Sequence, residues 1–289
     1  MTSVPFEVRP LGKTFFAEII GLDLSQPFDD ATFAAVKEAF YRHSTLLFRG
    51  QSLTETQQLD FTRRFGPLYD HVMGQFAHPT YPDVLVVSNI IENDKPIGLA
   101  DAGRLWHADL SYRDPGSAGA MLYAREIPPQ GGDTLFADSL AAYEALPPDL
   151  AARIKGRNAV HSYLSSHYRL KETYQTRPDL TAEQLEQLDE VVHPLAFIHP
   201  GNGRTGLYVS EGFAVRVEGL EEEDSRALLD ALNAHVTEER FLYRHQWQVG
   251  DLLFWDNRST IHKAAGGYAW PQRRLMHRTT LKGEPLQAA

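Results

Sequence analysis

The chain has 289 residues, with 28 Lys and Arg against 38 Asp and Glu, so its formal net charge is −10 at pH 7. Its 43% hydrophobic content is that of a globular protein, and the absence of cysteine excludes disulfides, cysteine-ligated zinc and a cysteine nucleophile. The acidic balance disfavours a nucleic-acid partner, because phosphate backbones attract clustered Lys and Arg. Any catalysis must therefore depend on His, carboxylate, hydroxyl or metal chemistry.

The amino terminus, Met1 to Pro10, lacks the basic start and the continuous apolar core of a secretory signal. The sequence contains no run of about 18 apolar residues that could span a membrane. We therefore expect a soluble, cytoplasmic protein with no membrane partner. Pro and Gly are scattered instead of gathered into a linker, which predicts one domain over residues 1–289.

Helices and buried strands alternate in the first hundred residues. Residues 29–42 begin with acidic side chains and carry apolar residues at helical spacing, which predicts a helix. The apolar run 45–50, closed by a glycine, predicts a strand. A second helix is expected from Thr54 to Phe65, and a second strand at 84–88.

After residue 100, short strands separated by Gly, Pro and Asp dominate the pattern. Strands are expected at 119–124, 206–209, 240–249, 251–255 and 273–281. Helices are expected at 139–146 and 221–236, and a mobile loop within 162–190. Many short strands with helices packed outside them indicate a mainly β fold with decorating helices, built on a sandwich or barrel core.

The segment from Gly201 to Gly206 fits the dinucleotide-binding pattern G-x-G-x-x-G. That pattern binds a nucleotide only when it follows a strand and opens a helix. Here it leads into residues 207–209, which have the composition of a strand. We therefore expect a glycine-rich hairpin turn.

Two distant segments carry candidate metal ligands. His107 and Asp109 are two residues apart, so within a strand their side chains would share a face. His262 follows the strand expected at 251–255 and a polar turn. Two His and one carboxylate on one face of an iron ion leave its other positions open, as in non-haem Fe(II) oxygenases. The alternatives are a surface His paired with a carboxylate, and a buried, hydrogen-bonded His262.

The strand expected at 273–281 places Arg274, Met276 and Arg278 on one face. Two guanidinium groups that face a core are costly unless they meet anions, and Arg suits carboxylate or sulfonate groups. The pattern therefore indicates anionic ligands, unless this face is the exposed side of an edge strand.

Together, and in this order, short motifs of the chain resemble the taurine/chlorophenoxyacetate dioxygenase family. Its members are Fe(II)- and 2-oxoglutarate-dependent oxygenases on a double-stranded β-helix (jelly-roll) fold. The likeness covers nearly the whole chain. The motifs are Arg64-Phe65-Gly66, Trp106-His107-Ala108-Asp109, Gly131-Gly132-Asp133-Thr134, Glu211-Gly212-Phe213, Trp255-Asp256-Asn257-Arg258, His262 and Gln272-Arg273-Arg274-Leu275-Met276-His277-Arg278.

The resemblance implies Fe(II), 2-oxoglutarate and O2 as cofactor and cosubstrates. His107, Asp109 and His262 match the family's iron ligands. Thr134 matches the threonine that, with Arg274, holds the distal carboxylate of 2-oxoglutarate.

The resemblance also implies a substrate site. Arg278 matches the arginine near the anionic end of the substrate, and we expect it to contribute to cofactor binding as well. Phe213 matches an aromatic wall of the substrate pocket. His71 falls near the family's substrate-binding histidine, but its flanking residues differ from those of the taurine enzymes, which argues against taurine itself. Ala108 also replaces the usual Thr, whereas the carboxylate of Asp109 argues against a halogenase.

The implied reaction is hydroxylation of a small anionic organic substrate, such as a sulfonate, sulfate ester or aryloxy acid, with release of succinate and CO2. Relatives form dimers or tetramers, so a homo-oligomer is expected by likeness. Two other classes stay open. A metal-dependent hydrolase or isomerase on a jelly roll would work with zinc and without oxygen. A non-catalytic anion-binding jelly roll would bind acids but release no succinate.

Overall fold

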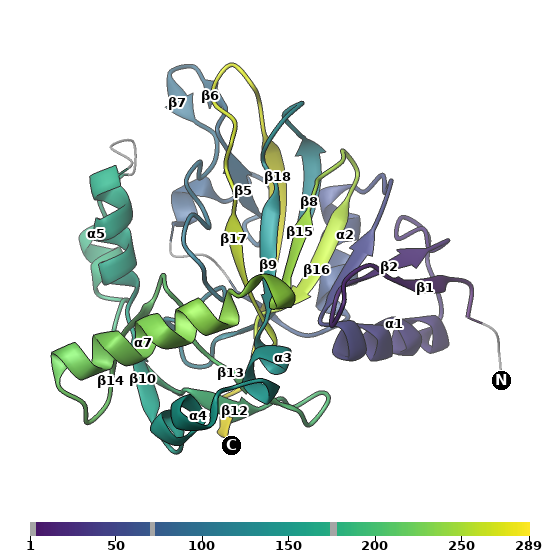
Figure 1. Cartoon of the computed structure of the whole chain (residues 1–289). Coiled ribbons are helices and arrows are strands. Elements are labelled where there is room, and N and C mark those ends of the chain that lie inside the picture. Colours follow the sequence, from purple (N-terminus) through teal and green to yellow (C-terminus); the bar gives the residue numbers. More distant parts are fainter. Residues whose placement is uncertain (1–3, 70–72, 174–177) are drawn as a thin grey trace.

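An eight-stranded sheet forms the framework of the computed structural model, which describes residues 4–69, 73–173 and 178–289 (Figure 1). Its strands run in the order β1-β2-β3-β16-β8-β18-β4, and β5 also pairs with β18. Of these pairs, only that between β2 and β3 is parallel among the described residues. The strands are β1 (Glu7–Pro10), β2 (Ala17–Ile20), β3 (Thr45–Phe48), β4 (Leu68–Tyr69), β5 (Leu85–Ser88), β8 (Ser117–Glu126), β16 (Leu252–Asp256) and β18 (Leu275–Lys282).

A three-stranded sheet faces the large one and has the order β15-β9-β17. Its strands are β9 (Thr134–Asp138), β15 (Leu242–His245) and β17 (Thr260–Ala264). Between the two sheets lies an apolar core, in which Phe136 of β9 meets Trp255 of β16 with ring centroids 5.7 Å apart. Leu122 of β8 and Met276 of β18 belong to the same core. The two facing sheets form the double-stranded β-helix, or jelly roll, that the sequence predicts.

Helices α1 and α2 cover the outer face of the large sheet (Figure 1). Phe40 of α1 stacks on Phe254 of β16, with ring centroids 3.7 Å apart. Each of these helices begins at a side-chain cap, Asp29 for α1 and Thr54 for α2. The helices are α1 (Asp30–His43), α2 (Glu55–Arg63), η1 (Gly74–Phe76), α3 (Ser139–Glu144), α4 (Pro148–Ile154), α5 (Tyr163–Thr173), α6 (Ala182–Leu185), α7 (Glu222–Val236) and η2 (Glu239–Phe241).

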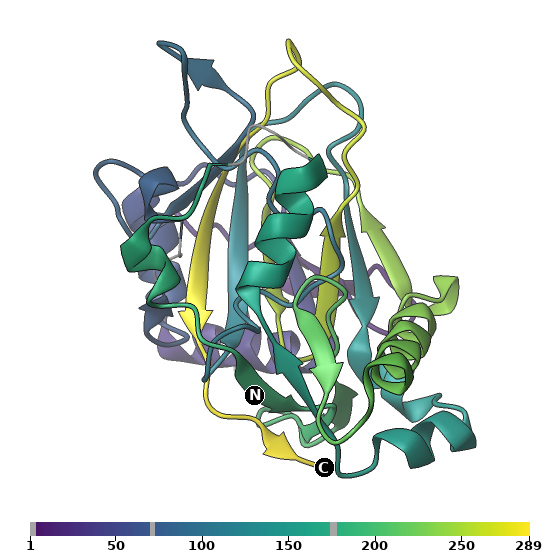
Figure 2. The ribbon, with the colours of Figure 1, turned by 90° about the vertical axis from the view of Figure 1, so that its left-hand side faces the viewer.

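A second apolar core lies beside the jelly roll, where α3, α4 and α7 pack on two small sheets. Figure 2, viewed from the side on which α5 lies, shows α5 in front of the jelly-roll strands. The small sheets have the orders β11-β10-β14 and β13-β12-β19, and β6 pairs with β7. These strands are β6 (Ile91–Glu92), β7 (Lys95–Pro96), β10 (Asn158–His161), β11 (Val191–Pro194), β12 (Ala196–Ile198), β13 (Thr205–Leu207), β14 (Ala214–Val217) and β19 (Gln287–Ala288).

Most elements expected from the sequence are confirmed, with ends that shift by a few residues. The glycine-rich segment 201–206 is the hairpin turn between β12 and β13, where Gly203 adopts a φ of +71°. Within the residues that the structure describes, no helix has the length and apolar character needed to cross a membrane.

The segment 162–190 contains α5 and α6, and residues 174–177 between them lie outside the described part of the chain, so a mobile loop within this segment stays a prediction. Two expectations are wrong. The strand β18 is not an edge strand, because β8 pairs along one side of it and β4 and β5 along the other. His107 and Asp109 do not lie in a strand: His107 forms an isolated bridge and Asp109 lies in a turn.

Candidate metal centre

Two histidines far apart in the sequence are joined through their backbones. His107 N donates to His262 O at 3.0 Å, and His262 N donates to His107 O at 2.8 Å. His262 lies in the middle of β17, which pairs with β9 and so belongs to the small sheet of the jelly roll. The bridge brings the two imidazole rings together, with centroids 4.2 Å apart.

Asp109 reaches the same point from the turn that follows His107. The next residue, Leu110, has a φ of +54°, which bends the chain away from the bridge. The Asp109 backbone amide donates to Asn257 Oδ1 at 3.0 Å, and Asn257 Nδ2 donates to Asp109 Oδ2 at 3.3 Å. The sharp turn therefore aims the carboxylate at the two rings.

The three side chains have the spacing of metal ligands. His107 Nε2 lies 3.7 Å from Asp109 Oδ1, and His262 Nε2 lies 3.8 Å from Asp109 Oδ2. These separations are too long for hydrogen bonds, whereas two ligands bonded to one ion at about 2 Å lie about 3 to 4 Å apart. Across residues 4–69, 73–173 and 178–289, no other group of three His, Asp or Glu side chains meets this condition. The donor set fits an ion that prefers imidazole and carboxylate ligands.

The protonation states also suit a metal ion. His107 Nδ1–H donates to the Leu105 carbonyl oxygen at 2.8 Å, which leaves the Nε2 lone pair on the side of Asp109. Burial, with His107 nearby, holds the pKa of His262 well below its usual range, so that this ring is neutral at pH 7. Burial alone would raise the pKa of Asp109, but the Arg278 guanidinium holds it well below its usual range. The site thus offers two imidazole nitrogens, His262 as a neutral ring, and one carboxylate.

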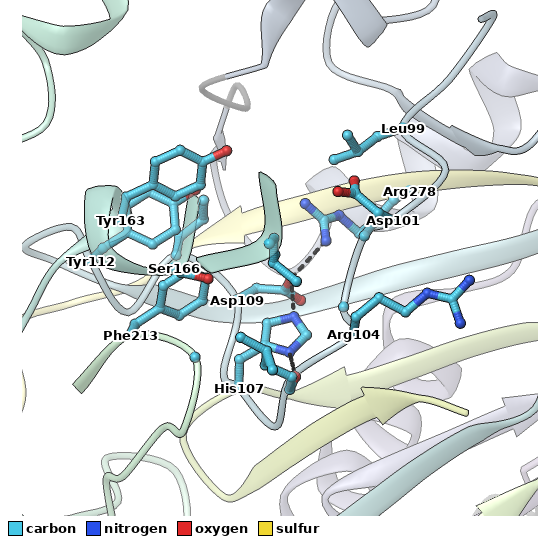
Figure 3. Close-up of a pocket in the computed structure, with 16 residues that line it drawn as sticks. Leu99, Asp101, Arg104, His107, Asp109, Tyr112, Tyr163, Ser166, Phe213 and Arg278 are labelled. Carbon is cyan, nitrogen blue, oxygen red and sulfur yellow. Dashed lines mark hydrogen bonds and ion pairs between the residues drawn. The ribbon is translucent and has the colours of Figure 1, made fainter. Parts of the chain in front are cut away.

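Two arginines point into the same region: Arg278 lies in β18, and Arg274 directly precedes that strand. Arg278 Nη1 donates to Asp109 Oδ1 at 2.6 Å (Figure 3). Arg274, four residues earlier, lies on the same face, and both side chains are buried. The Nε atoms of both arginines lack a hydrogen-bond partner among the described residues. Buried donors of this kind are costly unless an acceptor reaches them, so their surroundings suit anions.

Two cavities meet at the three candidate ligands, and both are lined by His107 and Arg278. The first also contains Asp109 and the aromatic side chains of Tyr112, Tyr163 and Phe213 (Figure 3). The second is lined by Leu122, Thr134, Trp247, Trp255, His262 and Arg274.

Each cavity combines apolar walls with a few polar groups. In the first, the Tyr112 ring lies 4.7 Å from Tyr163 and 4.8 Å from Phe213, measured between centroids. These rings form an aromatic wall opposite the guanidinium of Arg278 (Figure 3). In the second, Thr134 Oγ1 accepts a hydrogen bond from Trp247 Nε1 at 3.0 Å, which leaves the hydroxyl hydrogen to donate to another acceptor.

The structure brings most of the expected site residues together. His107, Asp109 and His262 form one cluster. Thr134 and Arg274 line the second cavity, Phe213 lines the first, and Arg278 lies between the two. His71 lies outside the described residues.

Three residues of the site were not expected from the sequence. Tyr112 and Tyr163 complete the aromatic wall, but Tyr163 lies in a segment with few strong sequence signals, and neither has a distinctive spacing. Asn257 belongs to the family motif at residues 255–258, but only the fold shows that it contacts Asp109. The sequence indicates this role only through the position of Asn257, a polar residue directly after an apolar strand, where its side chain would need hydrogen-bond partners if buried.

Sequence comparison gives one consistent family. The family described as "Taurine catabolism dioxygenase TauD, TfdA family" matches residues 7–280. The chain is 35% identical to an alpha-ketoglutarate-dependent 2,4-dichlorophenoxyacetate dioxygenase of Cupriavidus pinatubonensis, over 94% of this chain and 96% of that protein. It is 32% identical to an alpha-ketoglutarate-dependent sulfate ester dioxygenase of Pseudomonas putida, over 98% of this chain and 91% of the relative.

Solved structures agree with these relatives. The complex of AAD-2 with Mn(II) and N-oxalylglycine superposes with a TM-score of 0.83 at 31% identity, covering 98% of this chain and 99% of that one. A taurine dioxygenase from Burkholderia xenovorans gives a TM-score of 0.80 at 30% identity, covering 98% and 92%. The fold, the match along nearly the whole sequence and the extent of identity agree: the chain belongs to the TauD, TfdA family of dioxygenases.

Proposed function

We propose that the chain is an Fe(II)- and 2-oxoglutarate-dependent dioxygenase that hydroxylates a small anionic organic substrate. The observation that carries this proposal is the cluster of His107, Asp109 and His262 between two cavities, each with a buried arginine. The names of the relatives, which act on 2,4-dichlorophenoxyacetate and on sulfate esters, support it.

His107, Asp109 and His262 would hold the ferrous ion. In the overall reaction, the iron lets 2-oxoglutarate and O2 oxidise a substrate C–H bond, giving succinate, CO2 and the hydroxylated product, with one oxygen atom in succinate and one in the product. The protein supplies three ligands on one side of the ion, so its other side stays open to exogenous groups. Imidazole and carboxylate ligands suit iron, and the neutral ring of His262 need lose no proton to bind it.

The second cavity is the proposed cosubstrate site. Arg274 and Thr134 would hold the distal carboxylate of 2-oxoglutarate, because a guanidinium and a hydroxyl both donate to carboxylate oxygens. The indoles of Trp247 and Trp255 and the Leu122 side chain line the same cavity and exclude water. AAD-2, which was solved with Mn(II) and N-oxalylglycine, supports a shared site for a metal and a small dicarboxylic acid.

The first cavity is the proposed substrate site. Arg278 would hold the anionic end of the substrate, and the rings of Tyr112, Tyr163 and Phe213 would pack against its apolar part. This pairing of a cation with an aromatic wall suits a sulfonate, a sulfate ester or an aryloxy acid. Hydroxylation at a carbon next to the ether or ester oxygen would give an unstable product that splits.

The proposal includes one domain and three further expectations from the sequence. One domain over residues 1–289 is supported by a family match that runs from residue 7 to residue 280. A contact of His71 with the substrate, a cytoplasmic location and a homo-oligomer stay predictions.

A succinate assay tests the proposed function. The protein, loaded with Fe(II), is incubated with 2-oxoglutarate and a panel of sulfonates, sulfate esters and aryloxy acids, with and without O2. We expect succinate to form only with O2 and to increase strongly with at least one member of the panel. Turnover of a panel member without O2, or with zinc, would indicate a hydrolase or isomerase. Binding of acids without any succinate would indicate an anion-binding protein.

A further inference from the structure

The three candidate ligands differ in how the fold holds them. His107 and His262 are fixed by the two hydrogen bonds that their own backbones exchange. Asp109 lies in a turn outside the ladders of the sheets, and its backbone amide donates to a side chain, that of Asn257. The position of the carboxylate therefore depends on a side chain from the turn between β16 and β17.

We propose that Asn257 is a positioning residue of the metal centre, whose carboxamide fixes the Asp109 carboxylate in the orientation that binds the ion. This inference rests on the proposed function, because it assumes that Asp109 is a metal ligand. Asn257 does not line either cavity, and among the three candidate ligands its side chain hydrogen-bonds only to Asp109.

All four hydrogen-bonding positions of the carboxamide are used. Asn257 Oδ1 accepts from the Asp109 amide at 3.0 Å and from Trp255 Nε1 at 3.0 Å. Asn257 Nδ2 donates to Asp109 Oδ2 at 3.3 Å and to Ser117 Oγ at 2.9 Å. The two groups that face Oδ1 can only donate, so a flipped amide would oppose donor to donor. The orientation of the carboxamide is thus fixed by its neighbours.

The turn that carries Asn257 is itself rigid. Asp256 Oδ2 accepts from Arg258 Nη2 at 2.6 Å and from His199 Nε2 at 2.9 Å, and Asp256 Oδ1 accepts from the Arg258 backbone and Nε. The backbone amide of Asn257 donates to Ala118 O at 3.2 Å. Asn257 is 1% exposed, so no solvent competes for its contacts.

The contacts divide the two oxygens of Asp109 between two donors. Oδ1 accepts from Arg278 Nη1 at 2.6 Å, and Oδ2 accepts from Asn257 Nδ2. A carboxylate has about four acceptor positions, so each oxygen keeps a lone pair for the ion. Two donors in fixed places also stop the carboxylate from rotating about its Cβ–Cγ bond. Loss of the Asn257 donor would free that rotation and weaken the site.

A titration with Co(II) tests the inference without turnover. Metal-free wild type, Asn257→Ala and Ser117→Ala are titrated in the absence of O2 and 2-oxoglutarate, and the visible absorption bands of bound Co(II) report its ligand geometry. Ser117→Ala is the matched control, because Ser117 contacts the same carboxamide but not Asp109. Thermal unfolding of each metal-free protein measures any general loss of stability.

We expect Asn257→Ala to bind Co(II) about 10- to 100-fold more weakly than wild type, as for other groups that orient metal ligands. Its bands should shift in position or intensity, whereas Ser117→Ala should keep the wild-type affinity and spectrum. If Asn257→Ala does not fold, Asn257→Ser replaces it, because the shorter side chain withdraws the donor from Asp109 while it stays polar.

Wild-type affinity and spectrum in the folded Asn257 variant would overturn the inference, even if its melting temperature falls, because the residue would then serve only packing. An equal loss of affinity in Ser117→Ala would also contradict it, since that variant keeps both hydrogen bonds between the carboxamide and Asp109. Failure of the wild type to bind Co(II) would instead contradict the proposed function.

Discussion

Arg278 pairs with Asp109 and also lines the cavity proposed for an anionic substrate. It donates to Asp109 Oδ1 at 2.6 Å. A guanidinium has five N–H donors, so it can hold a ligand carboxylate and a substrate anion together. Its Nε has no hydrogen-bond partner among the described residues, and an incoming anion would supply one. In the proposed reaction, the substrate anion and the candidate ligand Asp109 would therefore share one cation.

Replacing Arg278 should weaken substrate binding more than cosubstrate turnover. In Arg278→Ala we expect the KM of the substrate to rise at least about 10-fold, because a charge-assisted hydrogen bond is worth about 1.5 to 3 kcal/mol. Uncoupled conversion of 2-oxoglutarate should stay detectable, since Arg274 is intact. Steady-state kinetics with succinate detection measures both quantities.

Arg273→Ala is the matched control for this prediction. Arg273 lies in the same segment, but it is exposed and pairs with Glu126, so its loss should leave the KM unchanged. An unchanged KM in Arg278→Ala would show that the anion of the substrate binds elsewhere.

A buried histidine on the other face of β18 gives the fold a dependence on pH. Burial and the neighbouring Arg125 lower the pKa of His277 to about 4, against the opposing effect of Glu55. The unfolded chain, with a His pKa of about 6.5, binds the proton at a higher pH than the folded chain does. The contribution of His277 to stability is therefore complete above about pH 6.5 and is lost as the pH falls towards 4.

The variant His277→Gln isolates this effect, because Gln does not titrate. Urea unfolding of the metal-free proteins at pH 7 and pH 5 should show a smaller loss of unfolding free energy in the variant than in wild type. The other buried histidines contribute equally to both proteins and cancel. Parallel losses in the two proteins would mean that His277 does not cause the dependence.

At the scale of elements, the sequence predicts those helices and strands whose apolar residues recur at a regular local spacing. The helix α1, the strand β16 and the alternation of β18 follow from apolar spacing, and the structure confirms each within a few residues. The bridge between His107 and His262 could not be found in this way. It joins residues 155 positions apart, and the segment around His107 pairs with a strand at one residue only.

The segment that forms α5 shows a second limit of local pattern. Its apolar residues are few, and it buries polar side chains such as Ser166 and His167. A helix that lines a cavity needs no continuous apolar stripe, so the sequence of α5 shows no clear helical spacing of apolar residues. Tyr163, which completes the aromatic wall, was missed for this reason.

The contact of α1 with the large sheet should be a major source of stability. Phe40 is buried and stacks on Phe254 with the two rings nearly parallel, at an angle of 3°. In Phe40→Ala we expect a loss of about 3 to 5 kcal/mol of unfolding free energy, as for other buried Phe residues. The partly buried Phe33 of the same helix is the control, and Phe33→Ala should cost clearly less.

Denaturant unfolding measures both values. Activity per folded molecule should stay at the wild-type level in both variants, because α1 covers the outer face of the sheet, away from the cavities. Equal losses in the two variants would contradict the prediction that the buried contact of Phe40 with the sheet is the stronger one.

At the scale of the whole molecule, the two sheets of the jelly roll set the site. The small sheet supplies His262 through β17, and the large sheet supplies Arg278 through β18. The turn that carries Asp109 contacts Arg278 of β18 and Asn257 in the turn between β16 and β17. The candidate site residues are thus brought together by long-range pairing. The resemblance to a family implies roles for His107, Asp109, His262 and Arg278, whereas composition and spacing alone leave other site types open.

Iron content and oxygen uptake in ligand variants test the central claim most directly. Wild type, His107→Ala, His262→Ala and His43→Ala are loaded anaerobically with Fe(II), freed of unbound metal, and mixed with 2-oxoglutarate, an active acid and O2. His43, in the last turn of α1, is the control histidine. We expect bound iron and oxygen uptake in wild type and His43→Ala, and the loss of both in the other two variants. Iron-dependent oxygen uptake at the wild-type rate in either His107→Ala or His262→Ala would contradict the assignment of the metal centre.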